Sequence, residues 1–337
     1  MAPWIVAVLV ASVAPAVQPP DCGLELSADA AHALLARHAP LVLIAPGERA
    51  WPASVAWALA RGPIPDGARS FPSLAEWLRM EVSAGTAGEG VPSPVRGPRP
   101  RPTPEAWPGS RSPLDWIVYG HAYGAEDGGV LLQYWFYYPF NDFYTLGDHE
   151  GDWEHVTVRL GPDLGPLGAW YAQHDENAPG EWSGWSALER EGDHPVVLSA
   201  RGSHASFPEP VDGLDVTCPG RDPAGAAARG CAVWRSWDAS AGGVVDVGTR
   251  AHPEPRAEFL RWPGRWGART HVAQLGGSPP GPAHQPGWCS AGLPGLRAAP
   301  AGAWRLEAVA RKGPPADEGA PAAEGSPARH RITTDGR

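Results

Sequence analysis

The stretch that decides the fold runs from residue 129 to residue 160 and reads GVLLQYWFYYPFNDFYTLGDHEGDWEHVTVRL. Its first part, 130–138, is rich in β-branched and aromatic residues, which favour strands. Its last part, 152–160, alternates with the period of two that a strand requires. The stretch therefore predicts two strands, joined by an acidic loop that contains glycine.

Shorter strand-like segments lie on both sides of this stretch. Segment 115–123 precedes it, and the Glu-Asp-Gly-Gly turn at 126–129 predicts a hairpin with 130–138. Further strands are expected at 168–174 and 196–199, and near Val244 and Phe259. Several short strands separated by turns indicate an antiparallel β-sandwich. We therefore expect a mainly β protein with short flanking helices and long loops rich in proline and glycine.

Composition divides the chain into segments. Residues 1–16 resemble a secretory signal peptide, because an apolar run ends in Ala-Pro-Ala. This run is too short to span a bilayer, so we expect no transmembrane segment in the mature chain. The other expected segments are a helical and loop segment at 21–113 with helices at 27–38 and 73–84, a β-sandwich metal-binding domain at 114–290, and a disordered tail at 294–337. The protein is expected to be secreted, or to lie in the periplasm or cell envelope.

The four cysteines agree with an oxidising compartment. Cys218 and Cys231 bracket a short loop rich in glycine and alanine, which predicts a local disulfide. Cys22 and Cys289 would then pair by elimination, although four cysteines permit three connectivities. The formal net charge of -10 argues against nucleic acid as a partner, because phosphate binding requires a basic surface.

A cluster of acids at the start of strand 152–160 suggests a cation site. On a strand, Asp152 and Glu154 point to the same face, where their carboxylates repel each other. A metal ion or an arginine is therefore expected between them. The preceding loop can add His149 and either Asp148 or Asp142. An acidic surface loop with a salt-bridged pair is the alternative.

Such a ligand set constrains the metal. Three oxygen donors and one imidazole favour calcium, magnesium or manganese, and leave zinc or iron possible. A second polar cluster contains His174 and the turn that presents Arg201 and His204. Here His204 could close the metal site, or Arg201 could balance its acids. His174 and His204 are also the candidate general acids or bases if the protein is an enzyme.

Several of these motifs occur together, in order, in a known family. The matching stretches are 129–141, 147–159, Gln173-His174, 195–199 and 202–208. They resemble the family of vacuolar protein sorting-associated protein 62. That family is similar to the necrosis-inducing protein-like cytolysins, secreted β-sandwich proteins marked by the heptapeptide GHRHDWE. The corresponding stretch of this chain reads DHEGDWE.

The resemblance implies a complete ligand set. It makes His149, Asp152 and Glu154 metal ligands and Asp142 the fourth. It also implies a calcium or magnesium ion that helps to engage glycosylated sphingolipid head groups on a membrane.

The heptapeptide differs from that of the cytolysins. Asp148, Glu150 and Gly151 replace its first glycine, its arginine and its second histidine. The added negative charge favours cation binding over lipid recognition or toxicity.

Three functions remain open from the sequence. The first is a secreted, divalent-metal-binding β-sandwich that recognises a lipid or glycan head group on a surface, as the cytolysins do. The second is a metal-dependent hydrolase, with metal-bound water as the nucleophile. The third is a structural envelope protein that an ion stabilises. The sequence favours binding over catalysis.

Overall fold

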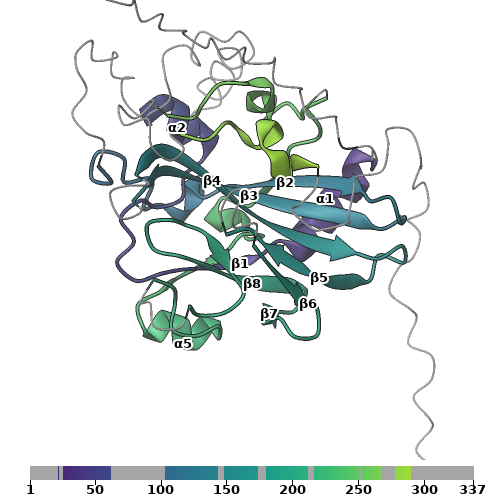
Figure 1. Cartoon of the computed structure of the whole chain (residues 1–337), viewed down its shortest axis with the longest axis horizontal. Coiled ribbons are helices and arrows are strands. Elements are labelled where there is room, and N and C mark those ends of the chain that lie inside the picture. The colour runs from purple at the N-terminus through teal and green to yellow at the C-terminus, as the bar shows by residue number, and fades with distance from the viewer. Residues whose placement is uncertain are drawn as a thin grey trace, which may run out of the picture. The chain divides into compact units, whose positions relative to one another are not determined.

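The computed structural model describes residues 22, 26–61, 103–142, 148–173, 180–211, 216–250, 252–267 and 278–289. Within these ranges the chain forms two β-sheets and short helices (Figure 1), which confirms the mainly β sandwich. The predicted signal peptide at 1–16, the helix at 73–84 and the tail at 294–337 lie outside the described residues and stay predictions.

The larger sheet contains the strands that the sequence identifies most clearly. Its order is β11-β2-β3-β4-β5-β6. The strands are β2 (Val118–Gly124), β3 (Val130–Asn141), β4 (His149–Leu160), β5 (Pro166–Tyr171), β6 (Glu181–Gly184) and β11 (Val244–Asp246). The predicted β2–β3 hairpin is confirmed, with Gly124 opposite Val130. Strand β4 begins earlier than predicted, at His149, which pairs with Asn141.

The second sheet has the order β10-β1-β8-β7, with β9 paired to β8. Its strands are β1 (Leu41–Ile44), β7 (Arg190–Glu191), β8 (His194–Ser199), β9 (Ser206–Phe207) and β10 (Ala232–Arg235). The expectation of purely antiparallel sheets is corrected here, because β1 runs parallel to β8 and β11 runs parallel to β2. Strand β1 comes from the N-terminal part of the chain and lies between β8 and β10.

Short helices flank the sheets. The α-helices are α1 (Ala28–His38), α2 (Val55–Arg61) and α5 (Pro223–Ala228), and 3₁₀ turns include Pro113–Asp115, Ala239–Ala241, Glu258–Arg261, Pro282–His284 and Pro286–Trp288. Helix α1 confirms the predicted helix at 27–38, and the Ser27 hydroxyl caps it by accepting from the Ala30 N–H at 3.4 Å. Its buried face consists of Ala31, Leu34, Leu35 and His38. The strand expected near Phe259 is wrong, because Phe259 lies in a 3₁₀ turn.

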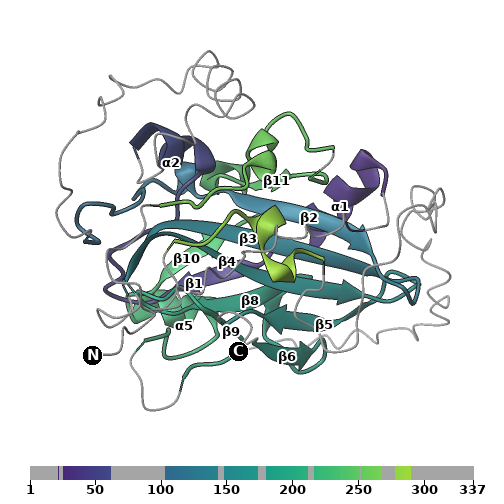
Figure 2. The same ribbon diagram turned by 45° about the horizontal axis from the view of Figure 1, so that its top comes forward.

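Strand β3 is buried on both of its faces. Toward the second sheet, the Phe136 ring packs edge-on against Trp234, and the Tyr138 hydroxyl lies 3.1 Å from Ser199 Oγ. On the other face, Trp135 belongs to a core with Trp288 from the C-terminal 3₁₀ turns, which lie across the sheet (Figure 2). Burial on both faces explains why β3 reads as a continuous apolar run.

Two disulfides join the described segments. Cys218 pairs with Cys231, and Cys22 pairs with Cys289, which is the pairing that the sequence favours. The second bond ties Cys22, ahead of α1, to the turns that cover the larger sheet. None of the helices in the described ranges is long and apolar enough to cross a membrane.

Candidate functional site

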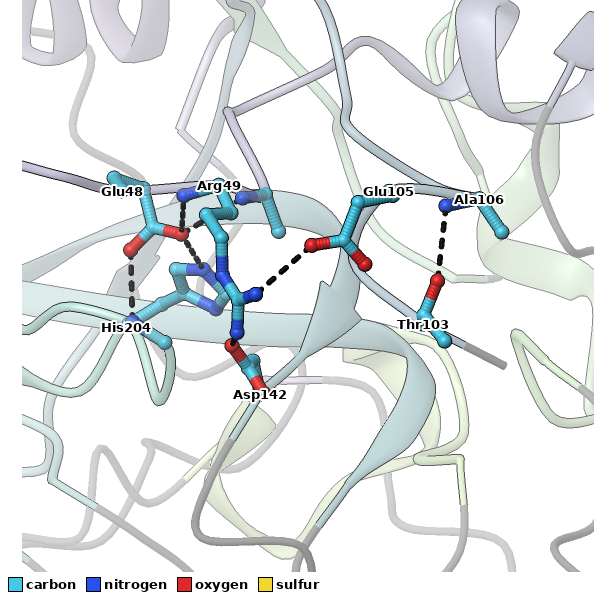
Figure 3. Close-up of polar contacts among 9 residues, drawn as sticks. Glu48, Arg49, Thr103, Glu105, Ala106, Asp142 and His204 are labelled. Atoms are coloured by element: carbon cyan, nitrogen blue, oxygen red, sulfur yellow. Dashed lines mark hydrogen bonds and ion pairs between the residues drawn. The ribbon is translucent and has the colours of Figure 1, made fainter. Parts of the chain in front are cut away.

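Charged residues from distant parts of the chain meet at one end of the sandwich. Figure 3 shows five of them, Glu48, Arg49, Glu105, Asp142 and His204. We call this group the acid site; it consists of Glu48, Arg49, Glu105, Asp142, Asp152, Glu154 and His204. The loop after β1 and the turn after β8 reach the same end because the two strands are parallel neighbours. The end of β3 and the start of β4 also lie there, since the Asp142 N–H donates to the Gly202 carbonyl at 2.9 Å.

The turn after β8 requires glycine at position 202. Gly202 has a φ of 80°, and a Cβ there would lie 2.4 Å from the Asp142 carbonyl oxygen. Any side chain would therefore push the turn away from the end of β3. The same turn holds His204 at a φ of 55°, a conformation that is uncommon for a residue other than glycine. The backbone thus fixes where the imidazole lies.

His204 is enclosed between two carboxylates. Its Nδ1 donates to Asp152 Oδ2 at 2.8 Å, and its Nε2 lies 3.6 Å from Glu48 Oε1. Its ring stacks on Tyr138, with centroids 3.8 Å apart. Only 1% of the residue is exposed. A cation in this position neutralises two acids that would otherwise be buried without an opposite charge.

Backbone N–H groups hold the Glu48 carboxylate in place. Its Oε1 accepts from the N–H groups of Arg49 and Ala50, both at 2.7 Å, and its Oε2 accepts from Gly202 at 2.8 Å. Burial by itself would raise the pKa of Glu48, but His204 and these donors lower it to about 2. Burial would likewise lower the pKa of His204, but Glu48 and Asp152 outweigh it and raise the pKa to about 9. At neutral pH the pair is therefore ionised.

These pKa shifts predict how stability changes with pH. The pKa of His204 is raised above its ordinary 6.5, so its contribution is complete below pH 6.5 and is lost as pH rises through about 9. The pKa of Glu48 is lowered from 4.5, so its contribution is present above pH 4.5 and is lost as pH falls through about 2. We expect urea denaturation to show a loss of roughly 3 kcal/mol in unfolding free energy from pH 6.5 to 9. A flat profile over this interval would contradict the ion pairing.

The side chains of Asp152 and Glu154 point to the same face of β4, as the strand period predicts. They lie opposite Tyr138 and Phe136, toward the second sheet, whereas His155 lies on the other face against Trp135. The cation that the described chain places beside Asp152 is His204 and not an arginine, and the predicted metal stays a prediction. Burial and the neighbouring Asp152 charge raise the pKa of the Glu154 carboxyl well above its usual range. No described residue forms a hydrogen bond with that carboxyl.

Asp142 has a different partner. The Arg49 guanidinium forms an ion pair with Asp142, and its Nη1 lies 2.8 Å from Glu105 Oε1 (Figure 3). Arg49 is half exposed, unlike the enclosed His204. The acid site therefore contains two internal cations, one buried and one at the surface.

His149 occupies the start of β4, opposite Asn141 at the end of β3. Its Nδ1 lies 2.9 Å from the Gly151 carbonyl, and its Nε2 lies 2.9 Å from the Asn141 amide nitrogen. The structure thus brings His149, Asp142, Asp152 and Glu154 to the same end of the β3–β4 pair. Across the described ranges, however, no three His, Cys, Asp or Glu side chains are gathered closely enough to hold an ion together.

The donor chemistry nevertheless fits a hard divalent cation. Asp142, Asp152 and Glu154 offer carboxylate oxygens, which calcium and magnesium prefer, and His149 offers one nitrogen. The guanidinium on Asp142 shows that this carboxylate already takes a cation. A bound ion would have to replace that internal cation, and the ligand side chains would have to turn toward it.

The remaining predicted residues do not join the site in the expected way. Arg201 is exposed and forms no ion pair with any described acid, so it does not balance Asp152 and Glu154. His174 lies outside the described residues. His204 is protonated at neutral pH and therefore cannot accept a proton as a general base. The hydrolase alternative stays a prediction without support from His204.

Glu48, Arg49 and Glu105 are residues of the acid site that the sequence did not single out. The available signal was a charged Gly-Glu-Arg group directly after the short apolar run at 41–44. Polar residues at the end of a buried strand often form sites, and this pattern would have identified Glu48 and Arg49. Glu105 has no comparable signal, because it lies in a segment rich in proline.

Solved structures of necrosis-inducing proteins are similar to this chain at low identity. Necrosis and ethylene inducing protein 2, from the causal agent of cocoa's witches' broom disease, is 19% identical, with a TM-score of 0.31 over 52% of this chain and 66% of its own. NLPPya in complex with glucosamine is 18% identical, with a TM-score of 0.30 over 54% and 67%. The non-toxic HaNLP3 protein is 15% identical, with a TM-score of 0.34 over 73% and 86%. The chain spans about two thirds of the length of the first two proteins.

A family model matches part of the chain more directly, whereas no curated protein matches it. The match covers residues 131–219. This segment contains the four predicted metal ligands and His204, but not Glu48, Arg49 or Glu105. Through residues 131–219 the chain thus resembles the family of vacuolar protein sorting-associated protein 62.

Proposed function

We propose that the chain is a secreted binding protein that recognises a hydroxyl-rich head group, of a glycan or a glycolipid, on a surface. In this proposal the acid site binds the head group, and a calcium or magnesium ion held by Asp142, His149, Asp152 and Glu154 takes part. The two disulfides favour an extracellular location, because such bonds persist in oxidising compartments.

The Glu154 carboxyl is the observation that carries the proposal. It lies beside Asp152, its pKa is raised, and no described residue forms a hydrogen bond with it. A carboxyl held next to another acid without a partner is costly for the fold, and an added cation would relieve this cost. Asp152 is already fixed by His204, so the ligand position beside it is preorganised.

A bound divalent cation would supply positive charge for polar oxygens of a ligand. The residues of the chain have separate tasks. His204 and Glu48 hold Asp152 and the turn after β8 in place, and the His149 ring is oriented by the Asn141 side chain. The partly exposed Asp142 lies where the site meets solvent. This arrangement suits the capture of a head group from solution or from a surface.

Calcium binding tests the proposal. We expect titration calorimetry with CaCl₂ to show binding to the wild-type chain. The affinity should fall on the order of tenfold or more in Glu154→Gln, because the variant offers the ion an amide in place of a carboxyl that can ionise. Glu154 has no described hydrogen bond to lose, so the melting temperature should stay the same or rise. Glu209→Gln is the control, since Glu209 is exposed and pairs with Arg221. Equal calcium affinity in all three proteins would refute the ligand assignment.

The nature of the head group can be tested with vesicles. Phosphatidylcholine vesicles with and without a neutral glycosphingolipid are incubated with the protein in calcium or in a chelator, and then floated. Retention only with the glycosphingolipid and calcium supports a sugar head group. Retention on both kinds of vesicle indicates that the protein binds the phospholipid instead. If the protein is retained on neither, the ligand is not a glycolipid in a membrane.

A further inference from the structure

Arg49 joins two acids from separate parts of the chain. Its guanidinium forms an ion pair with Asp142 after β3 and another with Glu105, whose carboxylate lies 2.8 Å away (Figure 3). Asp142 is also one of the oxygen donors in the proposed calcium site. The chain thus places its own monovalent cation on a carboxylate that a divalent cation would use.

We propose that Arg49 is an internal competitor of the divalent cation, and that it sets the affinity of the site. A calcium ion then binds Asp142 only as the Arg49 guanidinium leaves it. The inference rests on the proposed function, because it concerns the same site. Arg49 lies outside residues 131–219, the segment that matches the family model, so the inference assigns a role in the site to a residue that this match does not include.

The surroundings of Arg49 favour exchange over a fixed structural role. The side chains of Arg49 and Glu105 are 54% and 64% exposed, and exposed ion pairs contribute little to folding. The pair of His204 with Asp152 is enclosed, and its loss would leave a buried charge. Arg49 is therefore the cation of the acid site that can leave at low cost.

The backbone of Arg49 stays in place when the side chain moves. The Arg49 N–H donates to Glu48 Oε1 at 2.7 Å, and Glu48 is buried and held by other donors. Only the side chain has to rotate, and Glu105 remains as a partner for the guanidinium. Release of Asp142 therefore breaks one ion pair and leaves the loop after β1 intact.

The test compares calcium affinities of full-length variants by titration calorimetry with CaCl₂. Arg49→Gln removes the competing charge and should bind calcium on the order of tenfold more tightly than the wild type, because a like charge next to the ion is lost. Arg49→Lys keeps a cation and should stay close to the wild type. Arg37→Gln is the matched control, since Arg37 is also exposed and pairs with an acid, Asp193, away from the site.

The outcomes separate this inference from the proposed function. If the wild type binds calcium and Arg49→Gln binds it equally or more weakly, Arg49 is not a competitor, although the metal site stands. If neither protein binds calcium or magnesium, the metal site and the competition both fail. Tighter binding in Arg49→Gln that is lost again in Arg49→Gln/Glu154→Gln supports both.

A second readout follows the guanidinium itself. The Nε–H resonance of Arg49 can be assigned by its loss in Arg49→Gln. During a CaCl₂ titration of the wild type it should shift in step with calcium binding, because the Asp142 ion pair is broken. Calcium binding with no change at this resonance would overturn the competition. If calcium binding weakens the Arg49–Asp142 ion pair, that ion pair must weaken calcium binding by the same factor.

Discussion

Replacing His204 by asparagine is expected to lower the free energy of unfolding by about 3–5 kcal/mol, because the variant leaves the buried carboxylates of Glu48 and Asp152 without a cation. The imidazole is 0% exposed as a side chain and lies between the two acids. Asparagine is chosen because it tolerates the positive φ of this position, so backbone strain is not the cause of the loss. Urea denaturation measures the effect.

His155→Asn is the matched control for this substitution. His155 is also a buried histidine, but it lies on the other face of β4 against Trp135, and burial lowers its pKa to about 4. It is therefore neutral at pH 7, and its loss should not change the dependence of stability on pH between 6.5 and 9. His204→Asn should remove that dependence. A stability loss below about 1 kcal/mol in His204→Asn would show that the two acids are not ionised in the fold.

Loss of the Cys22–Cys289 disulfide should have the largest effect. The bond closes a loop of 267 residues, whereas Cys218–Cys231 closes one of 13. Because the entropy of the unfolded chain is restricted more by a longer loop, replacing Cys22 and Cys289 by serine should cost about 5 kcal/mol, and replacing the other pair about 3 kcal/mol. Guanidinium denaturation of both double variants gives the comparison.

The segment that is destabilised should also differ between the two disulfide variants. Cys289 directly follows Trp288, which stacks on His121 with ring centroids 3.7 Å apart and covers the larger sheet. Without the Cys22 bond, amide exchange should accelerate in segment 278–289 before the second sheet responds. If the pair Cys218 and Cys231 proves the more costly to remove, closure of the long loop is not the main stabilising effect.

The residues of β3 and β4 illustrate what the sequence can predict. The period of two placed Asp152 and Glu154 on one face of the strand, and the structure agrees. This inference depends only on neighbours along one strand, so it requires no knowledge of the rest of the fold. The prediction of the local Cys218–Cys231 disulfide succeeded for a similar reason, since the two cysteines are close in sequence.

The partners of those acids were not predictable in the same way. Arg49 and Asp142 are 93 residues apart, and Glu48 and Gly202 are 154 apart. Their contacts depend on the parallel pairing of β1 with β8, and a parallel pair leaves no turn signature between its strands. The sequence therefore indicated that a cation was needed, but it offered His204 only as a metal ligand and did not single out Arg49.

The placement of β1 between β8 and β10 determines when the acid site can form during folding. Strand β1 ends at Ile44, but its neighbours on the two sides begin only at His194 and Ala232. Glu48 and Arg49 follow β1 directly, so they reach His204 and Asp142 only after these long-range pairings form. Such contacts form slowly, because a long stretch of chain must be brought together first. A chain that ends before residue 235 would therefore contain β3 and β4 but not a complete β10. Strand β1 would then lack one of its two neighbours, and Glu48 and Arg49 would not be held at the acid site.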